Sequence, residues 1–371
     1  MNSGPIMIMA GGTGGHVFPA LAVAEQLRQQ NVSVVWLGTR QGLEATLAPQ
    51  AGIPMAWISV AGLRGTGLKR LLLAPFMLSK ALLQAVAILL RLKPVLVLGM
   101  GGFASGPGGL IARCLGIPLV VHEQNAIVGM TNRWLSRFAN RVLQAFPDSF
   151  PPQRHALSVG NPVRSEIAAL APPYQRFEHR QGCPRLLVLG GSQGALALNQ
   201  LVPQALARLQ PEQRPQIRHQ AGGRLHTAAE IAYREAAVEA SVEPFIEDMA
   251  SAYGWADLVL CRAGALTVAE LAAAGVGALL VPFPYAVDDH QTVNARFLER
   301  AGAALVLPQA TLTVERLAEQ LRLLLADRAR LLAMAEAARV LARTDAAEQV
   351  AAVCLEQACL SAGKRRQQVK S

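Results

Sequence analysis

Aromatic residues, charged residues and cysteines are all scarce in this sequence. Aromatic residues make up 5% of the 371 residues and charged residues 16%, whereas hydrophobic residues make up 52%. So much apolar surface with so little charge excludes an intrinsically disordered chain. The five cysteines form no Cys-x-x-Cys pair and no Cys/His cluster, which argues against a disulfide framework and a zinc site. We therefore expect a globular α/β protein with reduced, buried thiols.

The N-terminus has no signal-peptide pattern, and the positive charge is unevenly distributed. A strand-like run, Ile6 to Ala10, follows the first residues without a basic start, so we expect no export. The net charge is +10, and residues 1 to 163 carry 13 Lys/Arg against 4 Asp/Glu. This excess predicts an anionic partner for the N-terminal half. Scarce aromatics and the lack of RNA-binding motifs exclude nucleic acid in favour of an anionic membrane surface.

The length and an internal repeat indicate two domains. A shift of 179 residues aligns Met7 to Gly15 with Leu186 to Gly194, each an apolar run followed by a Gly-Gly-[Ser/Thr]-x-Gly turn. Such a run is typical of a buried parallel strand, and an Ala/Leu-rich helical stretch follows each turn. We predict two Rossmann-like, doubly wound α/β domains. Their expected bounds are 1–163 and 164–344, with a helix at about 345–360 packing back on the first domain and a disordered basic tail at 361–371.

Residues 63–93 form the longest apolar segment. Residues 71–90 are long enough to span a bilayer, but a central Lys80 costs about 2.5 to 3.5 kcal/mol on insertion, so we do not expect a span. Two alternatives stay open: a helix packed on the sheet, or an interfacial membrane patch. Basic residues flank the segment at Lys69, Arg70, Arg91 and Lys93.

Glycine-rich turns follow several predicted strands. The first, Gly11 to His16, has four glycines in five positions, then an imidazole, and enters a helix that we expect to begin near Pro19. Glycines let the backbone approach a ligand, and helix N-termini favour anionic or polar groups. A second turn, Gly99 to Ala104, matches the dinucleotide pattern G-x-G-x-x-A, with Glu123 about 20 residues later. This pattern supports an alternative function, an NAD-dependent oxidoreductase.

A further turn, Arg262 to Glu270, follows the predicted strand Leu258 to Leu260. It would place a helix N-terminus beside a carboxylate one turn into the helix. That arrangement suits a diphosphate on the amides and ribose hydroxyls on Glu270. Alternatively, Glu270 only interacts favourably with the helix dipole.

Six motifs, in register from about residue 6 to the final helix, resemble those of glycosyltransferase family 28. The resemblance is to its bacterial members that transfer N-acetylglucosamine from UDP-GlcNAc to undecaprenyl-diphosphoryl-muramyl-pentapeptide. It implies a GT-B fold, in which two Rossmann-like domains face a central cleft, the N-terminal one receiving the acceptor and the C-terminal one the nucleotide. The motifs are Gly11 to His16, Gly99 to Gly109, His122 to Asn125, Gly160 to Arg164, Gly190 to Gly194 and Arg262 to Glu270.

The resemblance also implies the substrate contacts. Ser192 would hold the diphosphate, Ile246 would pair through its backbone with uracil, and Glu270 would bind the ribose. Arg164 would lie near the nucleotide at the hinge. Other expected contacts are Thr13, Gly14, Gly15, Asn125, Gln291 and the helix start Ala265, Leu266, Thr267, Val268 and Ala269.

The implied reaction is an inverting transfer to the C4 hydroxyl of the acceptor, which needs a base and stabilisation of the departing diphosphate. We predict His16 as the base, because a neutral imidazole accepts a proton near pH 7, with Glu123 as the second choice. No Asp-x-Asp motif is present, so we expect no metal and no cofactor. The chain departs from the family at His290-Gln291, where relatives commonly carry Gln-Gln.

These implications define a place in the cell and the remaining alternatives. The resemblance implies the last cytoplasmic step of peptidoglycan precursor synthesis, hence cell-wall biogenesis, cell shape and cell division. We expect a peripheral protein on the cytoplasmic face of the bacterial inner membrane. The alternatives are another UDP-sugar-dependent GT-B enzyme, the oxidoreductase, and a non-catalytic scaffold that binds the membrane through residues 63–93.

Overall fold

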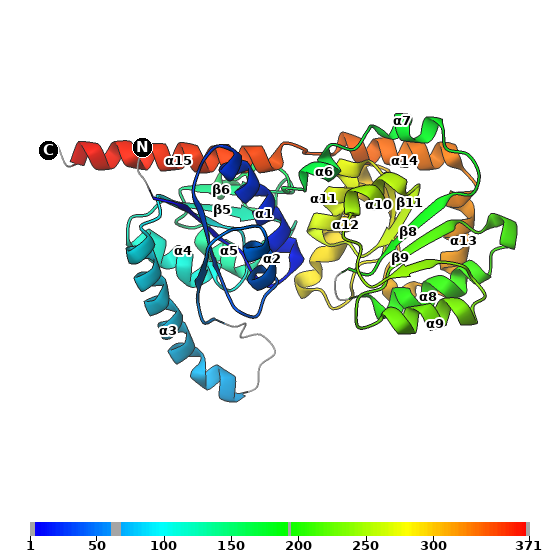
Figure 1. The fold of residues 1–371 in the computed structure, drawn as a ribbon, viewed down its shortest axis with the longest axis horizontal. Helices are drawn as coiled ribbons and strands as arrows, with labels where there is room; N and C mark the ends of the chain where they lie inside the picture. Colours follow the sequence, from blue (N-terminus) through cyan, green and yellow to red (C-terminus); the bar gives the residue numbers. More distant parts are fainter. Residues whose placement is uncertain (1–3, 61–67, 192–193, 369–371) are drawn as a thin grey trace. The chain divides into compact units, whose positions relative to one another are not determined.

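The computed structural model describes residues 4–60, 68–191 and 194–368. The contacts divide the chain after Arg164 and again after Thr344, and the residues beyond Thr344 belong with the first unit. Each unit is an α/β domain built on one sheet, and every strand pair among the described residues is parallel (Figure 1). The predicted fold class, two doubly wound domains, is confirmed.

The first unit contains a sheet in the order β3-β2-β1-β4-β5-β6-β7. Because β2 and β4 both flank β1, the connections run outward from β1 in opposite directions, as in doubly wound folds. The strands are β1 Ile6–Met9, β2 Val34–Gly38, β3 Met55–Trp57, β4 Leu96–Gly99, β5 Leu119–Glu123, β6 Arg141–Gln144 and β7 Leu157–Ser158.

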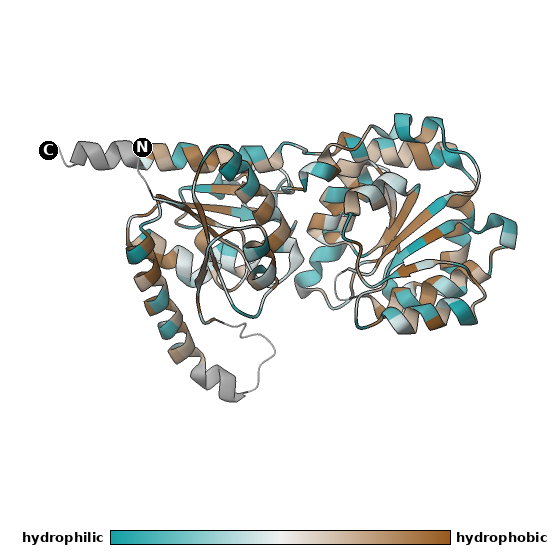
Figure 2. Cartoon of the chain, in the orientation of Figure 1, coloured by the Kyte–Doolittle hydropathy of each residue, from teal (hydrophilic) through white to brown (hydrophobic). Residues whose placement is uncertain are grey.

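Helices cover both faces of this sheet, because alternate side chains of its strands point to opposite sides. Ile6 and Ile8 of β1 lie in one core with α1 and α15, while Met7 and Met9 lie in another with α3, α4 and α5. Both cores are apolar, which explains the predominantly hydrophobic strands of this sheet in Figure 2. The helices are α1 Gly14–Gln29, α2 Glu44–Gln50, α3 Leu68–Leu92, α4 Ser105–Cys114, α5 Met130–Leu135 and α15 Ala346–Gln368.

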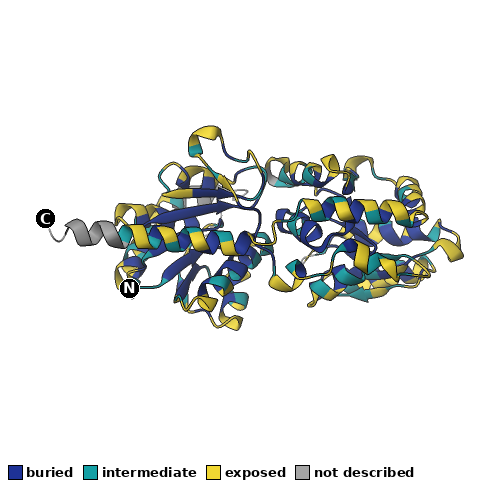
Figure 3. Ribbon diagram, turned by 90° about the horizontal axis from the view of Figure 1, so that it is seen from above, coloured by how far each residue is buried: buried dark blue, intermediate teal, exposed yellow. Residues whose placement is uncertain are grey.

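Two helices of the first unit differ from the sequence-based expectation. α1 begins at Gly14 rather than near Pro19, with Thr13 as its extended N-cap, because glycine accepts helical as well as extended dihedrals. α15 packs on α1, with buried and exposed positions alternating along it (Figure 3). It continues to Gln368 where a disordered tail was expected, because Lys, Arg and Gln have high helix propensity. Residues 369–371 lie outside the described residues.

The second unit contains a sheet in the order β10-β9-β8-β11-β12-β13. Leu186 and Val188 of β8 share a core with α8, α9 and α13, while α11 packs with α10, α12 and α14. The strands are β8 Arg185–Leu189, β9 Gln216–Gln220, β10 Ser241–Glu243, β11 Leu258–Cys261, β12 Gly277–Leu280 and β13 Ala304–Val306. The helices are α6 Ser165–Ala168, α7 Pro173–Glu178, α8 Leu196–Ala207, α9 His226–Glu235, α10 Met249–Trp255, α11 Ala265–Ala274, α12 His290–Arg300, α13 Val314–Leu325 and α14 Arg328–Val340.

The cysteines are free, as expected, but only two of them are buried. Cys261 is the last residue of β11, and Cys354 lies on the buried side of α15, whereas the other three are exposed. The expectation of buried thiols is wrong for Cys114, Cys183 and Cys359, because these residues lie at a helix end, in a loop and on the outer side of α15.

Candidate active site

Each unit brings its glycine-rich turns to the carboxyl edge of its sheet. In the first unit the turns after β1 and β4 lie side by side, because these strands are neighbours. In the second unit the same holds for the turns after β8 and β11. Doubly wound folds bind ligands at this switch point of the strand order. Each unit therefore has one site of the kind that the sequence predicted.

The two glycine turns of the first unit press against each other. Gly102 has φ +84°, and a Cβ there would lie 2.5 Å from the carbonyl oxygen of Gly11. A Cβ on Gly101 would lie 2.8 Å from the His16 ring. Gly101 of the G-x-G-x-x-A pattern therefore makes room for His16, and Gly102, at one of its x positions, makes room for the first turn. This packing contradicts the dinucleotide fingerprint at Gly99 to Ala104.

A buried carboxylate that the sequence analysis missed braces the first turn. Glu44, at the start of α2, accepts hydrogen bonds from the Gly12 amide at 2.9 Å and from the amide and hydroxyl of Thr39 at 3.0 and 2.8 Å. Its side chain is fully buried. Glu44 therefore holds the first turn in place. Glu44 and Gly12 are 32 positions apart, so no local spacing in the sequence reveals this contact.

Glu44→Gln is expected to lower the free energy of unfolding of the first unit by about 1–3 kcal/mol, because a buried NH₂ group then faces a hydrogen-bond donor instead of an acceptor. Urea unfolding followed by tryptophan fluorescence measures this, since Trp36, Trp57 and Trp134 lie in the first unit. Glu25→Gln on the exposed side of α1 is the control. Equal unfolding midpoints for the two variants would contradict the bracing role.

His16 is the third residue of α1 and is half-buried. Its Nδ1 lies 2.8 Å from Oε1 of Gln124, which follows β5. Helix geometry leaves the amides of Gly14 and Gly15 without intrahelical acceptors, beside the exposed Thr13. The predicted base and the predicted amide donors thus lie within one helical turn, where a hydroxyl and a polar group of one ligand can bind together.

Glu123, the second choice for the base, is committed to its own loop. Its Oε1 accepts from the amide and the side chain of Asn125 at 3.0 and 3.2 Å. Its Oε2 accepts from the Gly129 amide at 3.1 Å and from Asn132 at 2.9 Å. The side chain is almost entirely buried. Four donors on a buried carboxylate order the loop that carries Asn125, which argues against Glu123 as the base.

Arg164 is the last residue before the chain enters the second unit, and its side chain packs on α1. Its guanidinium lies 5.4 Å from the centroid of the Phe18 ring, and Phe18 in turn lies against Gly14. Such cation–π stacking holds the side chain in place. Arg164 is therefore positioned by the same helix as His16, and its contact with the nucleotide stays a prediction.

Burial depresses the pKa of one histidine in each unit. It lowers the pKa of His122 to about 4, opposed by a hydrogen bond to the Gly160 carbonyl and assisted by His16. It also lowers the pKa of His219 to about 3. Both rings are therefore neutral at physiological pH. His122 lies near the end of β5, just before the loop that carries Asn125.

These shifts predict acid-sensitive stability. Between pH 6.5 and about 4 the unfolded chain binds protons that the folded chain refuses, so the free energy of unfolding falls as the pH falls through this window. Each histidine contributes about 1.4 kcal/mol per pH unit across this window, or roughly 3 kcal/mol over the whole of it. Urea midpoints at pH 7.5 and pH 5 measure the loss, and His219→Gln should reduce it where the exposed His155→Gln does not. A midpoint that does not change with pH would refute this expectation.

In the second unit, Gln220 at the end of β9 joins two of the predicted nucleotide segments. Its carbonyl accepts from the Gly190 amide at 3.0 Å, and its Oε1 accepts from the Ile246 amide at 2.9 Å. The Ile246 amide is therefore bonded to Gln220 in this structure, and the pairing of uracil with the Ile246 backbone stays a prediction. Ser192 lies outside the described residues.

α11 has the predicted helix start, although not every residue assigned to it can reach a ligand. Gly264 is its extended N-cap, and the first intrahelical bond runs from the Val268 amide to the Gly264 carbonyl at 2.9 Å. The amides of Leu266 and Thr267 precede that bond, so they can face an anion. Val268 is fully buried with its amide committed, which argues against a contact of its own. Ala265 and Ala269 share the helix start.

Glu270 lies one turn further along α11. It is only 5% exposed, and its Oε2 accepts from the Tyr253 hydroxyl at 3.1 Å. Burial raises the pKa of the Cys261 thiol. The Glu270 carboxylate raises it further, and Arg262 opposes the shift. A carboxylate held in this way is pre-organised to accept further hydroxyl hydrogen bonds.

The loop before α12 carries Gln291 and the departure at His290. Oε1 of Gln291 accepts from the Phe283 amide at 2.9 Å, so the side chain organises its own loop. Asp288 and Asp289 both have positive φ, +54° and +52°, an uncommon conformation for residues other than glycine. This strain lies directly before His290, where the sequence departs from the family pattern.

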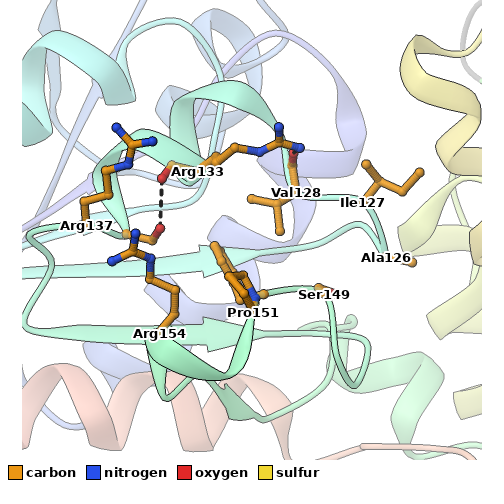
Figure 4. Close-up of a pocket in the computed structure, with 10 residues that line it drawn as sticks. Ala126, Ile127, Val128, Arg133, Arg137, Ser149, Pro151 and Arg154 are labelled. Atoms are coloured by element: carbon orange, nitrogen blue, oxygen red, sulfur yellow. Dashed lines mark hydrogen bonds between the residues drawn. The ribbon is translucent and has the colours of Figure 1, made fainter.

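A cavity of about 470 Å³ opens beside the Asn125 loop in the first unit. Arg133 of α5, Arg137 just after that helix and Arg154 of the 3₁₀ turn Pro152–Arg154 line it together with apolar groups (Figure 4). No carboxylate lines it among the described residues, so it favours an anionic group. It contains none of the predicted site residues. Nor do the described residues contain a cluster of three or more His, Cys, Asp or Glu side chains that could hold a metal ion.

Comparison with known proteins identifies the family. The glycosyltransferase family 28 N-terminal domain matches residues 6–144, and the C-terminal domain of the same family matches residues 185–350. Two curated relatives carry the name UDP-N-acetylglucosamine–N-acetylmuramyl-(pentapeptide) pyrophosphoryl-undecaprenol N-acetylglucosamine transferase. The one from Nitrosococcus oceani is 60% identical over 95% of this chain and 98% of its own. The one from Marinobacter nauticus is 57% identical over 95% and 97%.

A solved structure agrees with these relatives. Acinetobacter baumannii MurG is 44% identical, with a TM-score of 0.81 over 95% of this chain and 99% of its own. Family model, relatives and structure all extend across both units. The chain therefore belongs to glycosyltransferase family 28 and is a glycosyltransferase.

Proposed function

We propose that this protein transfers N-acetylglucosamine from UDP-GlcNAc to the C4 hydroxyl of undecaprenyl-diphosphoryl-muramyl-pentapeptide, with inversion. The observation that carries the proposal is the 60% identity, over nearly the full length of both chains, to a relative named for this transfer. Two features support it. In the first unit, the half-buried imidazole of His16 lies beside helix amides without intrahelical acceptors. In the second unit, the start of α11 lies beside the carboxylate of Glu270, which accepts a hydrogen bond from Tyr253.

In the proposed reaction the acceptor oxygen attacks the anomeric carbon of the donor as the bond to the UDP oxygen breaks. The α-linked donor gives a β-1,4 product. His16 receives the hydroxyl proton, and UDP leaves with the bonding electron pair. The Leu266 and Thr267 amides and the dipole of α11 stabilise the charge that develops on the diphosphate.

The direct test is transfer of labelled N-acetylglucosamine from UDP-GlcNAc to a lipid-linked muramyl-pentapeptide by the pure protein. We expect labelled lipid product that depends on both substrates. UDP-glucose is the matched donor control, because it differs only at the 2-position. Absence of product with folded protein would overturn the proposal, and equal use of UDP-glucose would favour another UDP-sugar-dependent enzyme of the same fold.

The oxidoreductase alternative makes a different prediction for ligand binding. Gly101 and Gly102 pack against His16 and the first turn, so the glycine pattern has a structural role. The oxidoreductase alternative therefore loses the sequence pattern that suggested it. We expect UDP to raise the melting temperature and NAD to leave it unchanged. Protection by NAD alone would reverse this conclusion.

We also propose that α3 attaches the protein peripherally to the cytoplasmic face of the bacterial inner membrane, where its product would enter peptidoglycan synthesis and so support cell-wall biogenesis, cell shape and division. By length and composition, Ala74–Leu92 could cross a membrane. Its Ala81, Ala85 and Leu89, however, pack in the core of the first unit, so the helix lies along the domain. The buried face of the helix agrees with the first alternative, a helix packed on the sheet. The proposed membrane contact uses the opposite, exposed face. Residues 61–67 lie outside the described residues.

The outer face of α3 carries the features of a lipid contact. Phe76 is 76% exposed and Leu83 is 71% exposed. The exposed basic residues Lys80, Arg91 and Lys93 accompany them. Apolar side chains beside basic ones suit the interface of an anionic bilayer.

The double variant Phe76→Ser, Leu83→Ser is expected to weaken binding to vesicles containing anionic lipid at least tenfold, because burying each such side chain contributes about 1.5–3 kcal/mol. Vesicle sedimentation measures this. Val340→Ser, at an 83% exposed position of α14, is the matched control. Transfer to a water-soluble acceptor should be unchanged. Undiminished vesicle binding by the double variant would contradict α3 as the contact.

A further inference from the structure

A chain of hydrogen bonds runs from His16 into the core of the first unit. Nδ1 of His16 lies 2.8 Å from Oε1 of Gln124. Nε2 of Gln124 lies 2.9 Å from Nδ1 of His122, and Nε2 of His122 lies 2.9 Å from the Gly160 carbonyl oxygen. Gln124 and His122 are almost entirely buried. Neither residue has a role in the proposed reaction so far.

The chemistry of the fixed groups determines the direction of each bond. The Gly160 carbonyl only accepts, so Nε2 of His122 donates to it and carries the proton. Burial lowers the pKa of His122 to about 4, so the ring is neutral and its Nδ1 must accept. The Gln124 end that contacts this nitrogen also lies 3.1 Å from the His122 carbonyl oxygen, so it must be the NH₂ group.

The orientation of Gln124 then fixes His16. With its NH₂ group turned to His122, Gln124 presents its carbonyl oxygen to His16, and this oxygen only accepts. Nδ1 of His16 therefore donates and carries the proton. The Gln124 backbone is held as well, because Asn161 donates to its carbonyl oxygen at 2.9 Å. In the neutral ring the lone pair is consequently on Nε2, for which the described residues show no hydrogen bond.

We infer that Gln124 is a positioning residue that holds His16 in the Nδ1–H tautomer, with His122 and the Gly160 carbonyl fixing the orientation of Gln124. The tautomer is a property of the structure alone, whereas its catalytic consequence rests on the proposed function. Nε2 of His16 is then the atom that receives the proton of the acceptor hydroxyl. The resulting imidazolium keeps its bond to Gln124.

A neutral amide in this position has a consequence for the pH dependence. A carboxylate bonded to the imidazole would favour its protonated form, whereas an amide orients the ring without adding charge. Among the described residues, the Gly101 backbone and the neutral His122 lie near the His16 ring. The carboxylates of Glu44 and Glu123 accept hydrogen bonds from backbone amides. Gln124 therefore orients the ring without placing a charge on it.

The tautomer is measured by long-range ¹H–¹⁵N correlation spectra of the full chain with ¹⁵N-labelled histidine, with His16→Gln providing the assignment. We expect His16 to show a protonated Nδ1 and an unprotonated Nε2, and Gln124→Leu to shift the ring to the Nε2–H form that free imidazole side chains prefer. An Nε2–H ring in the unchanged protein, or a tautomer unaffected by Gln124→Leu, overturns the inference. These spectra stand even if the protein transfers no sugar.

Kinetics separates positioning from a merely structural role. Gln124→Leu should lower kcat about 10²-fold, the effect of losing a correctly oriented base, with little change in KM for either substrate. Gln124→Glu keeps the shape and adds a charge, so the acid limb of the pH profile of kcat should move to higher pH. The exposed Gln153→Leu is the matched control. An unmoved acid limb in Gln124→Glu would contradict a direct link to the base.

Discussion

His16→Ala is expected to lower kcat by about 10²- to 10⁴-fold, the range for loss of a general base. The ring is half-buried at the first turn of α1, where alanine is also a good helix residue. The fold should therefore survive. Steady-state transfer rates at saturating substrate measure the loss.

The affinity of this variant for UDP should remain unchanged. His16 lies in the first unit, whereas the segments predicted to bind the nucleotide lie in the second. Isothermal titration with UDP checks this, and His155→Ala, at an exposed position of the first unit, serves as the control. A His16→Ala enzyme with more than a tenth of the original kcat would exclude His16 as the base.

Glu270→Gln is expected to weaken UDP binding by about 10- to 100-fold, because a hydrogen bond to a charged group contributes about 1.5–3 kcal/mol. The physical reason is the buried carboxylate beside the start of α11, which Tyr253 already holds. Titration of the variant with UDP measures the change.

A second ligand distinguishes ribose binding from a general effect on the helix. If Glu270 binds the ribose, 2′-deoxy-UDP or 3′-deoxy-UDP should bind the original protein more weakly than UDP, and the difference should shrink in Glu270→Gln. Tyr253→Phe removes only the internal hydrogen bond and is the matched control. A deoxy penalty of the same size in Glu270→Gln would show that the carboxylate acts on the helix dipole and not on the sugar.

The sequence predicted the architecture because the glycine turns mark strand ends. A buried apolar run precedes Gly11, and a similar run precedes Gly190. This repeated pattern predicts one parallel sheet in each half, and both glycine turns lie where the strand order reverses. Three short strands have no clear signal in the sequence: β3, β7 and β10. Each has two or three residues, at least one of them partly or fully exposed, too few to show a periodic pattern. They lie at sheet edges.

The positions of the candidate site residues differ in how far the sequence predicts them, and their roles stay predictions. His16 and Glu270 lie in the helices that follow β1 and β11, so their placement follows from the fold. Glu44 and Gln124 act on the first turn from 32 and 108 positions away, and no local spacing encodes such a contact. The dinucleotide pattern misled because a glycine that accommodates a neighbouring loop looks the same in sequence as one that accommodates a phosphate.

The central claim, an inverting transfer to one hydroxyl, is tested most directly by NMR of the product bond. The account predicts a β-linked N-acetylglucosamine on C4 of the muramyl sugar, and no transfer to an acceptor in which the C4 hydroxyl is replaced by hydrogen. An α-linked product, or transfer to the 4-deoxy acceptor, would contradict it.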